Sequence, residues 1–207
     1  TDGVWRANDC ISRQDQSTAP AASKFLCNDF LYVLGIPTPG HGRRWQFHQL
    51  RVKDETMRKL TIPIDDETIR ELKGGDAVLL SGTILTGRDT VHKWLIDTFI
   101  HSTRQAEGND EIVYAAIKPL LKGGVIYHCG PVVSGLESGD YQFVAAGPTT
   151  SIREEPYQGD IMRHFNIKGV IGKGGMGNHT LKACQETRGV YFHAIGGAAT
   201  LIAESVC

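Results

Sequence analysis

Apolar runs alternate with polar, glycine-containing stretches along most of the chain after residue 58. Runs rich in Val, Ile and Leu are typical of strands, and segments in which apolar residues recur every three or four positions are typical of helices. The apolar runs predict strands at residues 59–63, 77–85, 125–129, 142–146, 168–171 and 190–194. The amphipathic segments predict helices at residues 65–72, 89–100, 156–165, 178–187 and from residue 197 onward. Strands that alternate with helices indicate an α/β fold with at least some parallel pairing.

The first 58 residues do not follow this alternation. Residues 1–24 are polar and irregular, whereas Phe25–Ile36 is apolar enough to predict a short helix that docks on another surface. Two prolines and two glycines in residues 37–42 then interrupt any regular element. We therefore expect residues 1–58 to form an N-terminal extension or linker and residues 59–207 to form one domain.

Composition narrows the class of protein. With 207 residues and 41% hydrophobic content, the chain can bury one good core. Its formal net charge of −1 argues against a general binder of nucleic acid or of anionic membranes. The five cysteines are scattered and form no disulfide framework, which favours a reducing compartment, the cytoplasm or an organelle matrix.

Two turns that follow predicted strands carry the strongest candidate chemistry. The first reads Gly-Pro-Thr-Thr-Ser-Ile-Arg (147–153), and the second reads Gly-Lys-Gly-Gly-Met-Gly (172–177). Each leads into a predicted helix, whose first backbone N–H groups and positive end favour an anion. Arg88 lies at the end of another predicted strand, and its guanidinium suits a planar carboxylate. If these segments face one cleft, they form a carboxylate site.

Four motifs in this order resemble the C-terminal, or beta, part of class I fumarate hydratases and the beta subunit of L(+)-tartrate dehydratase. Besides the two turns, they are Ser-Gly-Thr-Ile-x-Thr-x-Arg-Asp-x-x-His (81–92) and Ala-Ile-Gly-Gly-Ala-Ala (194–199). The resemblance covers roughly residues 59–206. It implies the family's swivelling β/β/α domain, with a mixed sheet and flanking helices. It also implies one component of a hydro-lyase that interconverts fumarate and L-malate.

The resemblance assigns roles residue by residue. It places Arg88, Thr150, Arg153 and Lys173 among the groups that bind a dicarboxylate substrate. It makes Thr149 the catalytic residue, proposed in the family as the base that acts on the hydroxy acid. Threonine is a poor base unless a neighbour draws its proton away or stabilises its charged form. Ser151 and Ile152, beside these threonines, are the expected selectors of substrate.

The resemblance also implies a cofactor and a partner. The family's electrophile is a 4Fe-4S cluster, held by cysteines of a separate alpha domain or subunit. This chain has no Cys-x-x-Cys pair and no His-x-His or His-Glu-x-x-His motif, so we expect no metal site of its own. We therefore expect half an active site, completed by the alpha part, within a homo- or hetero-oligomer.

Two departures from the family and three alternatives remain open. A polar stretch at residues 102–111 looks like a surface insertion, and the chain stops at Cys207 where the family usually continues. The resemblance thus implies a missing C-terminal end, or strands supplied instead by the N-terminal extension. The substrate could be tartrate, or the chain could be a catalytically silent binding or scaffold subunit. Residues 172–177 also match the dinucleotide pattern Gly-x-Gly-x-x-Gly, but the next strand does not end in the acidic residue which that site requires.

Overall fold

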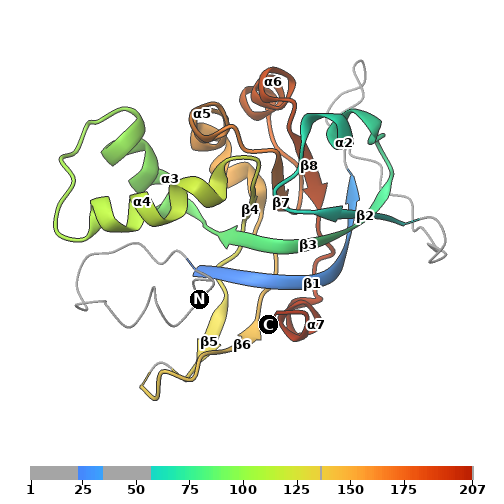
Figure 1. Cartoon of the computed structure of the whole chain (residues 1–207), viewed down its shortest axis with the longest axis horizontal. Helices are drawn as coiled ribbons and strands as arrows, with labels where there is room; N and C mark the ends of the chain where they lie inside the picture. The colour runs from blue at the N-terminus through green and yellow to red at the C-terminus, as the bar shows by residue number, and fades with distance from the viewer. Residues whose placement is uncertain (1–22, 35–56, 136, 207) are drawn as a thin grey trace.

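The computed structural model describes residues 23–34, 57–135 and 137–206. Its centre is a curled sheet in the order β1-β8-β7-β4-β3-β2, with a further pairing between β1 and β3 (Figure 1). The bounds of these strands are β1 Ser23–Leu34, β2 Arg58–Thr61, β3 Ala77–Thr86, β4 Val125–Tyr127, β7 Gly169–Gly172 and β8 Val190–His193. All pairs among β2, β3, β4, β7 and β8 are parallel, so their carboxyl ends lie along one edge.

Strand β1 closes the curl. It runs antiparallel to β3 along almost its whole length, from Ser23↔Thr86 to Val33↔Ala77. At its far end it also pairs antiparallel with β8, at Val33↔His193 and Leu34↔Phe192. The N-terminal segment therefore joins the two sides of the sheet.

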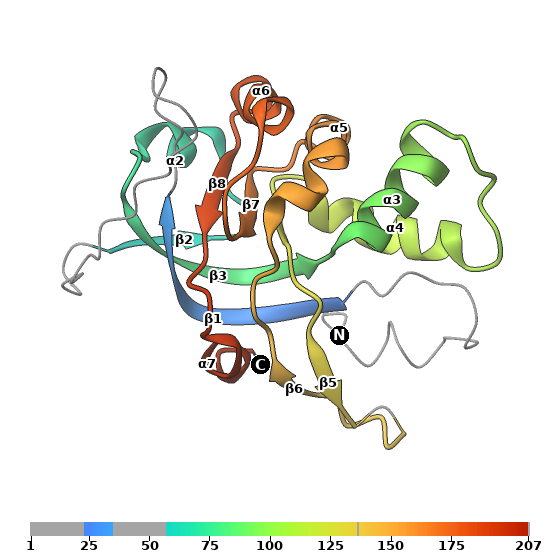
Figure 2. The same cartoon turned by 180° about the vertical axis from the view of Figure 1, so that it is seen from behind.

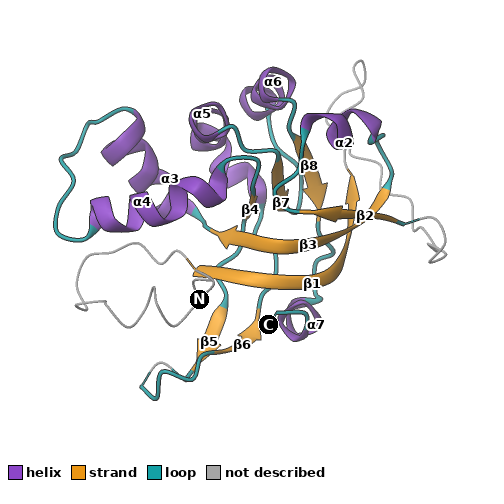
Figure 3. Cartoon of the chain, in the orientation of Figure 1, coloured by secondary structure: helices purple, strands orange, loops and turns teal. Residues whose placement is uncertain are grey.

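Helices cover the sheet on two sides. Helices α5 and α6 lie against each other on one side, and helix α7 lies with the short β5–β6 hairpin on the opposite side (Figure 2). The α-helices span α2 Asp66–Glu71, α3 Asp89–Leu95, α4 Asp110–Leu121, α5 Glu155–Phe165, α6 Asn178–Thr187 and α7 Ala199–Glu204 (Figure 3). Shorter pieces are the π-helical turn η2 (Ile96–Ile100), the 3₁₀ turn η3 (Ser151–Glu154), and strands β5 (Val132–Ser134) and β6 (Gln142–Ala145).

Two buried clusters hold these layers together. The first packs α3, α4, α5 and α6 on the sheet and includes Leu95, Ile161 and Met162. The second joins the sheet to α2 and α7 and includes Leu80 and Phe192. Because each helix buries only one face, this arrangement needs the alternating apolar pattern seen in the sequence.

The predicted α/β class and mixed sheet are confirmed, with two differences. Phe25–Ile36 was expected to be a helix, but Ser23–Leu34 is the strand β1, hydrogen-bonded along the edge of β3. An unbroken apolar run does not distinguish a buried strand from a helix. Here the segment is a strand because it pairs with the edge of β3. The polar stretch 102–111 leads into α4, a helix that the pattern did not reveal.

Within the described ranges, every helix is too short or too polar to cross a bilayer.

Candidate active site

Three motif residues and Gly130 lie at the carboxyl edge of the sheet. Arg88 follows β3, Gly130 follows β4, Lys173 follows β7 and Gly196 follows β8. In open α/β sheets this edge is where ligands bind. The structure thus places the predicted carboxylate-binding residues at the position that the topology favours.

The two candidate turns lie side by side. Thr150 and Lys173 form a parallel bridge. The amide of Ser151 donates to the carbonyl of Lys173 at 2.9 Å, and the amide of Lys173 donates to the carbonyl of Thr149 at 3.3 Å. The Thr149 amide in turn donates to the carbonyl of His128 at 2.7 Å. Thr149 and Lys173 are half-buried and Thr150 is exposed, so the joined turns border solvent.

The exposed Arg88 side chain lies across Gly130. A Cβ added to Gly130 would be 2.9 Å from Nε of Arg88 and 3.1 Å from its Cζ. The absence of a side chain at Gly130 therefore lets the guanidinium lie against the backbone after β4. Burial raises the pKa of the Cys129 thiol to about 12. The positive charge of the nearby Arg88 opposes this shift but is the smaller effect.

Arg153 pairs with Asp89 across the two turns. A terminal nitrogen of Arg153 donates to the Asp89 carboxylate, and the side chains are 59% and 39% exposed. Asp89 thus forms its ion pair with Arg153, which lies on the other turn. The ion pair therefore holds Arg153 beside the residue that follows Arg88, although the two paired residues are 64 positions apart in the sequence.

One expected anion site is already occupied. The carboxylate of Glu155 accepts from the backbone amides of Gly177 and His179 at 2.8 Å each, and from the Thr180 hydroxyl at 2.7 Å. These are the groups at the start of α6 that the sequence offered to a substrate carboxylate. An internal carboxylate satisfies them because a helix N-terminus attracts negative charge. The α6 helix end is thus not available for substrate, and Lys173 remains the attractive group of its loop.

Ser151 is not a direct selector of substrate. It is fully buried, and its Oγ accepts from the hydroxyl of Tyr191 at 2.9 Å. A Cβ on Gly172 would come within 1.8 Å of that same oxygen, so Gly172 gives Ser151 its space. Its neighbour Ile152 is 50% exposed and stays a candidate.

A buried polar network lies behind these turns. His92, His128 and Gln158 are all fully buried. The Gln158 side chain contacts Nε2 of His92 and Nε2 of His128, each at 2.8 Å. Nδ1 of His92 is 2.9 Å from the carbonyl of Arg88. The network therefore connects helix α5 to the backbone at Arg88.

The donors and acceptors fix the protonation of this network. Burial lowers the pKa of His92, and burial together with His92 lowers the pKa of His128 to about 3, so both rings are neutral at neutral pH. Because a carbonyl only accepts, the single proton of His92 lies on Nδ1 and bonds to Arg88. His92 Nε2 is then an acceptor, although the atom placed 2.8 Å from it is the amide oxygen of Gln158. Exchanging the oxygen and nitrogen of this amide, which have the same shape, gives Nε2 the donor that it needs.

Glu154 completes the buried group. Its side chain is fully buried, and its Oε2 lies 3.8 Å from Nδ1 of His92. Burial and the nearby Asp89 carboxylate raise the pKa of Glu154 to about 8, against weaker opposing effects of Arg153 and Arg88. Desolvation raises the pKa of Asp89, but hydrogen bonds from its own amide, from Glu154 and from Arg153 hold it below its usual value. At neutral pH the pair is thus one carboxylic acid beside one carboxylate.

The two cysteines whose side chains are described do not fit a metal cluster. Cys129 and Cys184 follow or occupy different elements, and burial raises the pKa of each to about 12, which keeps them as thiols. A cluster requires thiolates brought together. Across the described ranges, the structure contains no group of three or more His, Cys, Asp or Glu side chains able to hold a metal ion.

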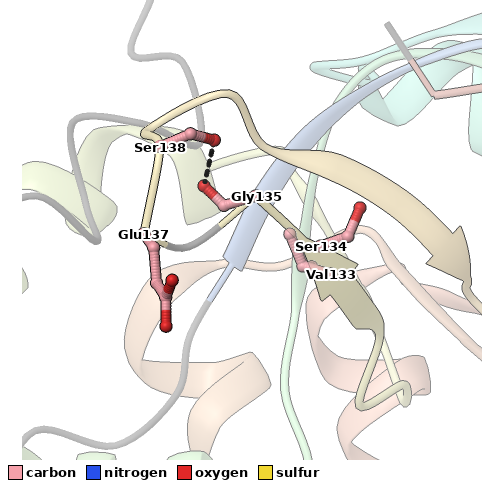
Figure 4. A pocket seen from close by; sticks show the side chains of 5 residues that line it. All are labelled: Val133, Ser134, Gly135, Glu137 and Ser138. Carbon is pink, nitrogen blue, oxygen red and sulfur yellow. Dashed lines mark hydrogen bonds between the residues drawn. The ribbon is translucent and has the colours of Figure 1, made fainter.

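A separate hollow of about 390 Å³ lies at the β5–β6 hairpin, lined by residues that include Val133, Glu137 and Ser138 (Figure 4). It holds none of the predicted site residues.

Three residues of the site were missed by the sequence reasoning. Glu154 and Glu155 follow Arg153 directly, and Gln158 is one turn further along α5. Acidic side chains after an arginine usually indicate a solvated surface, whereas Glu154 is buried against α3. Only its position next to the Gly-Pro-Thr-Thr motif could have drawn attention to it.

Comparison with known proteins gives a consistent result. A family model described as "Fumarase C-terminus" matches residues 41–207. A "Putative fumarate hydratase class I" of Geobacillus stearothermophilus is 49% identical over 163 residues, 78% of this chain and 28% of that protein. The "L(+)-tartrate dehydratase subunit beta" of Escherichia coli K12 is 34% identical over 148 residues, 71% of this chain and 65% of that protein.

A third relative is the "Putative L(+)-tartrate dehydratase subunit beta" of Methanocaldococcus jannaschii, 33% identical over 151 residues. The chain thus spans between about a quarter and two thirds of the length of these relatives. The family match covers most of the chain and includes every motif residue at the carboxyl edge of the sheet. The chain therefore belongs to the fumarase C-terminus family.

Proposed function

We propose that this chain is the beta component of a hydro-lyase that interconverts fumarate and L-malate. The observation that carries the proposal is the convergence of Arg88, Arg153 and Lys173 with Thr149 at one edge of the sheet. The match to a fumarate hydratase at 49% identity supports fumarate as the substrate.

The cations suit a dicarboxylate. Arg88 and Arg153 can each donate two parallel hydrogen bonds to a carboxylate, and Lys173 adds a point charge from the facing loop. When a proton leaves the carbon next to a carboxylate, negative charge spreads onto that carboxylate. Donors already placed there stabilise this charge, and one such donor commonly lowers the barrier by about 3 kcal/mol.

Thr149 handles the proton in this proposal. Its backbone is fixed between His128 and Lys173, which leaves its hydroxyl as the group to approach the substrate. The positive charges around it lower the cost of a transient alkoxide. The exposed Thr150, next in the chain, would hold the substrate in place with its own hydroxyl.

The remaining half of the site is proposed to belong to a partner. The family resemblance implies a 4Fe-4S cluster, and the buried thiols of Cys129 and Cys184 do not suit its ligation. We place the cluster on an alpha domain or subunit, in keeping with the word "subunit" in the names of the tartrate dehydratase relatives. Those relatives also make L(+)-tartrate the second candidate substrate.

The test is turnover by this chain with and without a candidate alpha partner, reconstituted anaerobically with iron and sulfide. Fumarate, L-malate and L(+)-tartrate should be assayed in parallel. We expect malate dehydration only with the partner, and a preference for malate over tartrate. Activity of the isolated chain would contradict the proposed division of the site, and a preference for tartrate would select the second substrate.

Arg153→Ala should reduce kcat/KM by at least about a hundredfold, because it removes a charged hydrogen-bond donor. Arg163→Ala is the matched control, since Arg163 makes a comparable ion pair with Glu186 away from the site. Near-normal turnover of Arg153→Ala would exclude Arg153 from substrate binding.

A further inference from the structure

Glu154 is a fully buried acid next in the chain to Arg153, and it has no part in the substrate binding proposed for the exposed cations. From α3 it faces Arg88, Asp89 and His92, and from its own turn it faces Arg153. Among the residues that the structure describes, the titratable group beyond His92 is the neutral His128, and the two ring centroids are 5.2 Å apart. Its position therefore couples it to both arginines that we propose as substrate ligands.

We propose that Glu154 is a positioning residue that works as a neutral acid and sets how many positive charges the site offers to a dicarboxylate. The inference rests on the proposed function only in taking Arg88, Arg153 and Lys173 as the groups that bind the carboxylates. Glu154 itself does not touch substrate, because its side chain is fully buried.

Within the described residues, both oxygens of the buried Glu154 carboxyl lack a donor to accept from, and the neighbouring acidic group is Asp89. Asp89 carries the negative charge of the pair and holds Arg153 through an ion pair. Two carboxylates this close are stable when they share one proton, and the acid then donates to the carboxylate. Protonated Glu154 thus orients Asp89, and Asp89 orients the Arg153 guanidinium.

The charge of Glu154 changes how strongly the site attracts a dicarboxylate. With Glu154 neutral, three cations outweigh the single carboxylate of Asp89, and the site attracts a dianion. Ionised Glu154 would add a second negative charge near Arg88 and Arg153, which removes part of that attraction. Since burial leaves little water to screen this charge, its effect on a bound carboxylate is large.

The pKa of Glu154 sets the pH at which the site becomes less attractive to a dicarboxylate. The pKa of Glu154 is raised to about 8 by burial and by Asp89, so the acid loses its proton just above neutrality. We therefore expect affinity for a dicarboxylate to be constant below this pH and to fall above it. The limiting slope is at most about tenfold per pH unit for loss of one proton.

The primary test measures binding of succinate, an unreactive dicarboxylate, by calorimetry between pH 6 and 9.5. It uses the full chain assembled with its alpha partner, in wild type, Glu154→Gln and the exposed control Glu111→Gln. Wild type and Glu111→Gln should show a Kd that rises above pH 8. Glu154→Gln, which stays neutral and keeps a donor for Asp89, should show a flat Kd. An equal rise in Glu154→Gln would overturn the proposal.

A second variant separates positioning from simple packing. Glu154→Ala loses the donor to Asp89, so KM should rise severalfold while kcat changes less, and Glu154→Gln should restore KM. If Ala and Gln behave alike, Glu154 does not position Arg153.

Thermal unfolding provides a check that does not depend on binding. A folded-state pKa above the unfolded value of 4.5 means that the native state holds an extra proton between about pH 4.5 and 8. Wild-type stability therefore falls as pH rises through this window, and Glu154→Gln lacks this contribution. The Tm of Glu154→Gln minus that of wild type should increase from pH 5 to 8. A constant difference would show that Glu154 is ionised throughout.

The outcomes distinguish this inference from the proposed function. If succinate binding follows the expected pH pattern but no hydro-lyase turnover is found, the inference stands and the proposed reaction is wrong. If turnover is found but the pH pattern is absent from wild type, the reaction stands and the inference is wrong.

Discussion

Gly130 decides how Arg88 lies at the edge of the sheet. A Cβ at this position would approach Nε of Arg88 to 2.9 Å, and the neighbouring atoms are the end of a flexible side chain. Gly130→Ala should therefore displace the guanidinium while changing the free energy of unfolding little. We expect KM for malate to rise about tenfold with a smaller change in kcat, as for loss of ground-state binding.

Gly196→Ala is the matched control for this substitution. A Cβ on Gly196 would lie 3.8 Å from Cδ of Lys173, an ordinary contact at the same edge of the sheet. Steady-state kinetics of Gly130→Ala and Gly196→Ala would measure the KM of each variant, and only that of Gly130→Ala should rise. Equal KM values for Gly130→Ala and wild type would show that Arg88 does not need this position to bind substrate.

Single residues also mark the limit of sequence reasoning. Arg88, Thr149, Arg153 and Lys173 were found because each stands in a motif at a strand end. The buried network was not found, because His92 and Gln158 are 66 residues apart and meet only when α3 packs on α5. No local pattern shows that a glutamate will be buried beside a second carboxylate.

At the scale of elements, the start of α6 depends on a side chain from another helix. Glu155, the first residue of α5, accepts from the Gly177 and His179 amides and from the Thr180 hydroxyl. Glu155→Ala leaves these groups without a partner and should lower the free energy of unfolding by about 1–3 kcal/mol. Urea unfolding measures this, and sulfate should recover part of the loss by binding at the vacated helix end.

Glu186→Ala is the control, because Glu186 lies at the other end of α6 and makes an exposed ion pair with Arg163. Such pairs contribute about 0–1 kcal/mol. If Glu155→Ala and Glu186→Ala destabilise the protein equally, the carboxylate of Glu155 is not the cap of α6.

Element types were predicted best where apolar periodicity was clear. The helices at α2, α3, α5 and α6 and the parallel strands were all located from their patterns. The segment Phe25–Ile36 was misassigned because its conformation depends on β3, a partner about 50 residues later. Helix α4 was missed since it begins inside a polar stretch and contains Pro119.

At the scale of the whole molecule, β1 protects an edge of the sheet. It covers β3 from Ala77 to Thr86, and an unpaired strand of this length invites pairing between molecules. Deletion of residues 1–34 should therefore cause self-association, which light scattering after gel filtration would detect. Deletion of residues 1–22 alone retains β1 and should give the same oligomeric state as the full chain. A well-behaved 35–207 fragment with wild-type Tm would contradict this role of β1.

The pairing of β1 has a further consequence for how the chain acquires its structure. Val33 pairs with both Ala77 of β3 and His193 of β8. The curled sheet therefore closes through residues that lie 44 and 160 positions later in the chain. Contacts of such large separation are formed late and slow the search for the native state. During synthesis, β1 leaves the ribosome before the other strands of this sheet but waits for β8, the last of them, before its second edge is paired. The first strand of the sheet to be synthesised is thus among the last to reach its final place.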